Sequence, residues 1–235
     1  MEVRAVMYKT LRKWLSLVFA LALPSSAAWS TQTAVAGMRV TISVHNDAGI
    51  SAGTLRGAEM EASRVFRQSG IEAKWLNCPL PADGPEDPAQ CRTAEFPAHL
   101  QLRIVRRSRN LSEITFGISY LSADGSGCYA NVFYQQVEQM HERSRVNLAG
   151  LLGDVAAHEI GHLLLGTNSH ATSGIMRARW EIEELGSISM GTLFFSDSES
   201  RQMRSKLATW QAKRKDDSRV ASARLEAEKV SFSSW

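Results

Sequence analysis

His158-Glu159-Ile160-Gly161-His162 is the stretch of sequence that decides the fold, and it lies in an apolar, helix-compatible segment. On an α-helix, residues four apart lie about 40° apart around the axis, so both imidazoles point the same way. Two such rings can bind one zinc ion, with each nitrogen at about 2.0–2.1 Å from the metal. Glu159 lies between them and can take a proton from water on the zinc. The stretch therefore predicts a helix that carries two metal ligands and a catalytic base.

A third ligand is expected shortly after this helix, because catalytic zinc sites usually have three protein ligands and one open position. Gly166 can adopt a positive φ at little cost, so it is predicted to end the helix and turn the chain back. The turn-forming residues 167–169 then lead to His170, the predicted third ligand. The alternative is a glutamate ligand, as in gluzincin-type zinc peptidases, supplied by Glu181, Glu183 or Glu184.

Met176 follows the predicted third ligand in the run Ser173-Gly174-Ile175-Met176. A methionine at this spacing can pack beneath the metal ligands as a hydrophobic floor without touching the metal. We therefore expect Met176 and Gly166 to support the metal ligands rather than to bind the metal themselves.

The segments before the motif predict a β-α-β unit. Residues 38–45 alternate and are rich in β-branched side chains, which favours a strand. Residues 51–69 carry apolar side chains at helical spacing, with Ser51 as a possible N-cap and Gly70 after the end. Residues 71–76 form a second short strand, expected to be the parallel neighbour of the first.

The later segments mix strands and helices. Three further strands are expected over residues 99–106, 117–121 (a strand or a loop) and 129–137. The helix that carries the motif spans residues 146–165, and residues 167–192 look irregular. A last helix is expected to start near Asp197 with Ser196 as its cap.

His158-Glu159-x-x-His162, Gly166, His170 and Met176 together resemble the signature of the metzincin clan of zinc metallopeptidases. This resemblance implies an α+β fold, a mixed β-sheet with an active-site helix, a second backing helix and a C-terminal helix. It implies hydrolysis of a peptide or protein substrate by a zinc-activated water, with Glu159 as general base. It also implies that the strand over residues 130–136 is the edge strand that pairs with substrate. The spacing departs from the usual pattern, because one extra residue precedes Gly166 and another precedes His170.

The N-terminus has the pattern of an export signal. Basic residues precede an apolar run of ten residues, Trp14 to Leu23, and Ser26-Ala27-Ala28 then forms a small-x-small cleavage site. Cleavage is expected after Ala28, with Ala36 as the alternative, and an uncleaved membrane anchor is the other interpretation. Ten apolar residues are short for a bilayer, which needs about 20, so no stable membrane span is expected after cleavage. A secreted or periplasmic protein is predicted.

The predicted organisation is a signal peptide over residues 1–28, a zinc-dependent peptidase domain over 38–210 and a polar tail over 211–235, either helical or disordered. The net charge of only +3 in 235 residues argues against a nucleic-acid partner, and no oligomeric state is predicted. Cys78 and Cys91 flank a turn-rich loop and are expected to form a disulfide, which leaves Cys128 over. A non-catalytic, metal-stabilised exported binding module is the alternative function.

Overall fold

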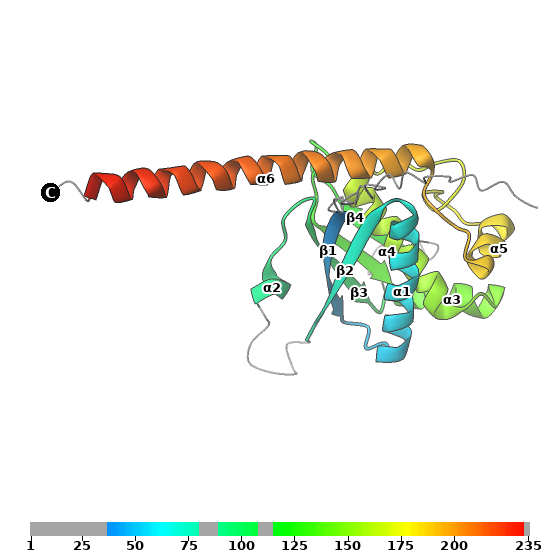
Figure 1. Ribbon diagram of the computed structural model, residues 1–235. Helices are drawn as coiled ribbons and strands as arrows, with labels where there is room; N and C mark the ends of the chain where they lie inside the picture. The colour runs from blue at the N-terminus through cyan, green and yellow to red at the C-terminus, as the bar shows by residue number, and fades with distance from the viewer. Residues whose placement is uncertain (1–36, 80–88, 108–114, 233–235) are drawn as a thin grey trace, which may run out of the picture. The chain divides into compact units, whose positions relative to one another are not determined.

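The computed structural model describes residues 37–79, 89–107 and 115–232, so the expected signal peptide lies outside the described residues. Five strands form one mixed sheet in the order β2-β1-β3-β5-β4. Figure 1 shows this sheet with the helices around it. The strands are parallel except β4, which pairs antiparallel with β5 at one edge. Their bounds are β1 Met38–Asn46, β2 Ile71–Cys78, β3 His99–Val105, β4 Gly117–Tyr120 and β5 Tyr129–Phe133.

The first three elements form the predicted β-α-β unit. Helix α1 spans Ala52–Gln68 and joins β1 to its parallel neighbour β2, with Met38 opposite Ile71 in register. The side chain of Ser51 accepts a hydrogen bond from the backbone N–H of Thr54, 3.1 Å away, and so caps the first turn. The expected strands, helix and parallel pairing are therefore confirmed.

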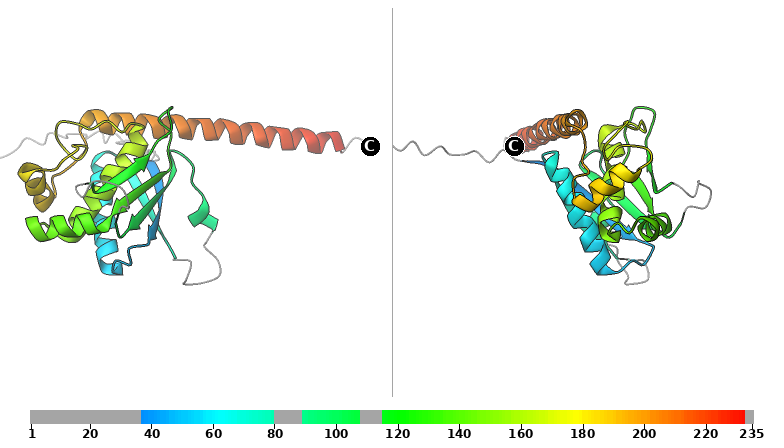
Figure 2. Two further views of the ribbon diagram at one scale, coloured as in Figure 1. Left: turned by 180° about the vertical axis from the view of Figure 1, so that it is seen from behind. Right: turned by 90° about the vertical axis from the view of Figure 1, so that its right-hand side faces the viewer.

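Helix α4, Leu148–Leu165, carries the histidine motif and is almost wholly buried. It begins after the N-cap Asn147 and ends at Gly166, whose φ of 69° is left-handed, as the sequence predicts. α4 packs against α1 and against strands β3, β5 and β4 of the sheet (Figures 1 and 2). Among the described residues, only this helix is long and apolar enough to cross a membrane, yet it is the core helix of the domain.

Helix α6 spans Asp197–Phe232, so the predicted last helix is confirmed and continues into the expected polar tail. Ser196 and Glu199 cap its first turn reciprocally: Ser196 N–H donates to the Glu199 carboxylate and Glu199 N–H to the Ser196 hydroxyl. Met203 and Leu207 are fully buried, whereas residues 212–222 are all exposed. The boundary between residues 210 and 211 falls inside this helix, and the proposed domain limits stay a prediction.

Two sequence-based assignments around β5 are wrong. The strand expected over residues 129–137 ends at Phe133, and helix α3, Tyr134–Ser144, follows at once. In addition, β5 lies between β3 and β4, so it is not the edge strand that the resemblance implied for residues 130–136. That position belongs to β4, because its antiparallel return places it outside β5.

Residues 167–192 are not wholly irregular, since helix α5 spans Ile182–Met190. The Cys78–Cys91 disulfide is present, linking the end of β2 to the short helix α2, Ala89–Arg92, while Cys128 is unpaired. The predicted α+β class, with a mixed sheet, an active-site helix (α4), a backing helix (α1) and a C-terminal helix (α6), is confirmed.

Candidate metal centre

Three histidine side chains converge at the C-terminal half of α4. The ligand atoms of His158, His162 and His170 all lie within 4.8 Å of one another. Nε2 of His158 and Nε2 of His162 are 3.1 Å apart, near the about 3.3 Å that separates two nitrogens in tetrahedral zinc coordination. The His170 ring lies 4.8 Å from the His162 ring, centroid to centroid, so the wider turn after Gly166 still brings His170 to the cluster.

The other ring nitrogens of the two helical histidines are held by backbone carbonyls. Nδ1 of His158 lies 2.6 Å from the carbonyl oxygen of Ile175, and Nδ1 of His162 lies 2.8 Å from that of Thr167. A carbonyl only accepts, so each Nδ1 must carry the hydrogen and each Nε2 keeps a lone pair for a metal. The donor set therefore fits a zinc ion.

Burial keeps these rings in the neutral form that binds metals. Burial, and then the charge of the neighbouring His162, lower the pKa of His158 to about 3. The pKa values of His162 and His170 are lowered too, mainly by burial. Because protonated imidazole cannot ligate, the three rings are ready for a divalent cation at neutral pH.

The loop after His170 folds back beneath the cluster. The N–H of Ala171 donates to the carbonyl of Met176, 2.9 Å away. Met176 is only 1% exposed, and it packs against α4 at Gly161, whose Cβ, if present, would lie 2.9 Å from the methionine sulfur. Met176 therefore lies in the core against α4, and its role as a hydrophobic floor beneath the ligands stays a prediction.

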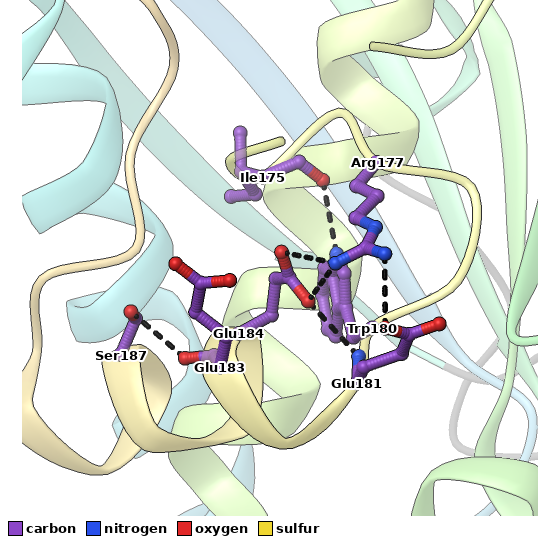
Figure 3. A network of polar contacts seen from close by, with 7 residues as sticks. All are labelled: Ile175, Arg177, Trp180, Glu181, Glu183, Glu184 and Ser187. Atoms are coloured by element: carbon purple, nitrogen blue, oxygen red, sulfur yellow. Dashed lines mark hydrogen bonds and ion pairs between the residues drawn. The ribbon is translucent and has the colours of Figure 1, made fainter. Parts of the chain in front are cut away.

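Trp180 and His158 donate to the same carbonyl oxygen, that of Ile175. The indole N–H of Trp180 lies 3.2 Å from this oxygen, and the contact closes the loop on itself (Figure 3). The Trp180 ring also meets the edge of the His158 ring, at 6.0 Å between centroids. The orientation of the His158 ring is therefore fixed by a loop that the hydrogen bond from Trp180 stabilises.

Two of the glutamates considered as alternative ligands, Glu181 and Glu184, form hydrogen bonds within the loop instead. The guanidinium of Arg177 donates to both oxygens of Glu184, at 2.9 and 2.8 Å, and to Glu181 at 3.0 Å (Figure 3). Glu184 is 3% exposed and also accepts from the N–H of Glu181. Within the described residues, none of Glu181, Glu183 and Glu184 belongs to the histidine cluster, so the glutamate alternative has no support in the geometry.

The carboxylate of Glu159 lies beside the edge strand β4. The Ser119 hydroxyl lies 2.6 Å from Oε2 of Glu159 and 2.7 Å from its backbone carbonyl oxygen. Burial raises the pKa of Glu159 to about 7, and the hydrogen bond from Ser119 opposes this rise. A carboxylate whose pKa is near neutral can both accept and return a proton.

The cluster and Glu159 line one cleft of about 530 Å³. Its lining includes residues 115–119, which contain most of β4, and the segment from Arg177 to Trp180. Phe116 and Trp180 stack across it, with ring centroids 6.3 Å apart. The cleft therefore brings β4, Glu159 and the histidine cluster to one site.

Sequence reasoning missed Gly117, Ser119 and Trp180. Only Gly117 carried a signal, because a glycine inside a strand often marks a close approach of another group. The partners of Ser119 and Trp180 are 40 and 5 residues away in sequence, and no local pattern announces either contact.

No family model matches the sequence, and no curated protein matches it. Among solved structures, the chain is similar to a zinc-dependent peptidase from Methanocorpusculum labreanum, at 17% identity and a TM-score of 0.45, over 69% of this chain and 99% of that one. It is also similar to archaemetzincin from Methanopyrus kandleri, at 13% identity and a TM-score of 0.44, over 74% of this chain and 98% of that one. At these identities and TM-scores neither likeness informs on function, which has to follow from this chain's own side chains.

Proposed function

We propose that this protein is a zinc-dependent peptidase of metzincin type, with His158, His162 and His170 as ligands and Glu159 as general base. One observation carries the proposal: three neutral imidazoles and one carboxylate converge in a cleft bordered by a β-sheet edge. Structural zinc sites are normally closed by four protein ligands, whereas this cluster has three among the described residues. An open position beside a carboxylate favours hydrolysis over a purely structural role.

In the proposed hydrolysis, the histidines would hold the zinc ion and Glu159 would transfer the proton. A zinc ion, when bound, supplies a Lewis acid that polarises a carbonyl and makes water more acidic. Glu159 accepts the proton of the attacking water and returns it to the amine of the leaving product. The buried position of its carboxylate, 5% exposed, keeps bulk water from competing for that proton.

The substrate is proposed to be an extended peptide that pairs with β4. This strand is bonded to β5 on one side and has no other partner among the described strands, so its outer edge offers main-chain donors and acceptors. Peptides bind such edges by adding a strand, with affinity from the main chain and selectivity from side-chain pockets. A substrate held along β4 would pass the cluster internally, which favours an endopeptidase.

Export is proposed on the order of basic, apolar and small residues at the N-terminus. Cleavage after Ala28 gives a mature protein that begins at Trp29, and the alternative site gives one that begins at Gly37. N-terminal sequencing of the protein recovered from a secreting host separates the two, and an intact Met1 in the cytoplasmic fraction would contradict export.

The function is tested by comparing the wild type with Glu159→Gln. Zinc content is measured by elemental analysis, and hydrolysis by mass spectrometry of a mixed peptide library. The wild type should hold one zinc per chain and cleave internal bonds. The variant should keep the zinc and lose about 100- to 10,000-fold in rate, the usual contribution of a general base.

The alternative of a metal-stabilised binding module predicts a different result. In that case the wild type binds zinc but cleaves nothing, and Glu159→Gln changes neither metal content nor stability. Equal hydrolysis by both proteins would instead remove Glu159 from the mechanism.

A further inference from the structure

We propose that Gly117 and Ser119 of β4 are positioning residues that fix the carboxylate of Glu159 against the edge strand. This inference rests on the proposed function of Glu159 as general base. The two residues, together called the carboxylate seat, lie two apart on a strand and therefore present the same face. That face is the one against which α4 packs beside the cleft.

Gly117 leaves the space that the Glu159 side chain fills. A Cβ on Gly117 would lie 2.5 Å from Oε1 and 2.6 Å from both Cδ and Cγ of Glu159. Such separations are far below van der Waals contact, so no other residue fits here while Glu159 stays in place. The φ of Gly117 is not positive, and the glycine is therefore needed for the close approach rather than for the backbone conformation.

Ser119 holds the same carboxylate from its other oxygen. Ser119 is 6% exposed, and its hydroxyl lies 2.6 Å from Oε2 and 2.7 Å from the backbone carbonyl oxygen of Glu159. Its single hydrogen can go to either oxygen, and an ionised carboxylate is the stronger acceptor. Among the hydrogen bonds of the described residues, none involves Oε1 of Glu159. The seat thus engages one oxygen and leaves the other, beside Gly117, for a reacting water.

Because of the carboxylate seat, one strand, β4, positions both the general base and the substrate. The substrate is proposed to pair with the outer edge of β4, and the carboxylate is bound to one face of the same strand. Any shift of β4 would therefore move the scissile bond and the base together. A displacement of about 1 Å in such a constellation costs about 100-fold in rate, so the seat matters to turnover rather than to binding.

The seat is tested with Ser119→Ala, Ser119→Thr and Gly117→Ala in the full chain. Ser119→Ala should lower kcat by about 10- to 100-fold with KM changed less than about 2-fold, and zinc content should stay at the wild-type level. Ser119→Thr keeps the hydroxyl and should restore kcat to within about 3-fold. Gly117→Ala should lower kcat at least as far as Ser119→Ala, because the methyl group displaces the carboxylate. Tyr129→Phe is the matched control: it removes a hydroxyl from a half-exposed tyrosine of the neighbouring strand β5, and its kinetics should equal those of the wild type.

A second readout does not depend on turnover. With ¹³C-labelled glutamate, the carboxyl resonance of Glu159 is assigned as the one absent from Glu159→Gln. Loss of the Ser119 hydrogen bond should move that resonance in Ser119→Ala. The resonance should return towards the wild-type position in Ser119→Thr and stay in place in Tyr129→Phe.

The outcomes distinguish a failure of the proposed function from a failure of the carboxylate seat. If the wild type hydrolyses no peptide, the proposed function fails, and the carbon resonance alone decides on the seat. A wild-type kcat in Ser119→Ala, an unmoved resonance, or a loss of kcat in Ser119→Ala that Ser119→Thr does not restore would overturn the seat.

Discussion

Lys206 of α6 donates a hydrogen bond to the carbonyl oxygen of Leu165, the last residue of α4, over 2.8 Å. The side-chain amide of Gln202 donates to the same oxygen over 3.0 Å. A cation at a helix C-terminus also interacts favourably with the partial negative charge of the last carbonyls. The C-terminal helix therefore fixes the point where α4 ends and the turn to His170 begins.

Replacing Lys206 with Met should lower the free energy of unfolding by about 1 kcal/mol, because a charged hydrogen bond is lost while the aliphatic stem and Gln202 remain. Lys206 is partly exposed, which limits the effect. Urea unfolding followed by circular dichroism measures it. Lys213→Met on the exposed part of the same helix is the control and should stay within about 0.5 kcal/mol of the wild type. Equal losses in the two variants would show that Lys206 has no special contact.

The sequence was sufficient for the parts of the site that follow local rules. The four-residue spacing of His158 and His162 depends only on the helical period, and Gly166 ends α4 because it can adopt a left-handed φ. The turn to His170 was inferred from the same glycine. These features are encoded within a dozen residues, so a single sequence predicts them.

The missed features depend on contacts between distant segments or on competing local signals. Tyr134 and Val137 extend the aromatic and β-branched run of β5, yet both are buried three apart on one face of α3. Periodicity cannot choose between strand and helix in so short a run, and tertiary packing decides it. The edge position of β4 likewise depends on the order of the strands in the sheet. The four residues of β4 do not by themselves predict which strand it pairs with.

Asp154 should contribute a loss of stability as the pH rises from about 5 to 8. This residue of α4 is 0% exposed, and neither carboxyl oxygen has a hydrogen-bond partner in the described residues. Burial, and then the charge of Glu61, raise the pKa of Asp154 to about 8, against the opposing effect of Arg64. An aspartate in the unfolded chain loses its proton near pH 3.9, so above that pH the unfolded state binds fewer protons and is favoured as pH rises.

Asp154→Asn tests this by removing the titration. The difference in free energy of unfolding, variant minus wild type, should increase steadily from pH 5 to pH 8 in urea titrations. Any fixed effect of the buried amide is the same at each pH, so the slope is the readout. A difference that does not change with pH would contradict the assignment.

Two glycines of α4 should respond to alanine with opposite signs. A Cβ on Gly161 would lie 2.6 Å from Cε1 of Phe195 and 2.9 Å from the sulfur of Met176, so Gly161→Ala overpacks the contact of α4 with these two side chains. A loss of about 1–3 kcal/mol is expected. On Gly150 the nearest atom is 3.7 Å away, and the better helix propensity of alanine should stabilise the protein by about 0.5–1 kcal/mol. Thermal unfolding of both variants measures the two changes in stability. A stabilised Gly161→Ala would show that Phe195 and Met176 pack loosely against α4.

His170→Ala should weaken zinc binding by more than about 100-fold, since even the loss of groups that only support ligands costs about 10- to 100-fold. A titration against a competing zinc chelator measures the affinity without reference to activity. His141→Ala removes a histidine outside the cluster and should bind zinc as the wild type does.

Glu184→Gln separates the histidine ligand from a glutamate ligand. Both oxygens of Glu184 are occupied by Arg177, and neither Glu184 nor Glu181 belongs to the cluster. Glu184→Gln should therefore lower stability, because a buried ion pair is broken, but retain tight zinc binding. The opposite pattern, with zinc lost in Glu184→Gln and kept in His170→Ala, would require the loop to rearrange when metal binds and would move the third ligand from histidine to glutamate.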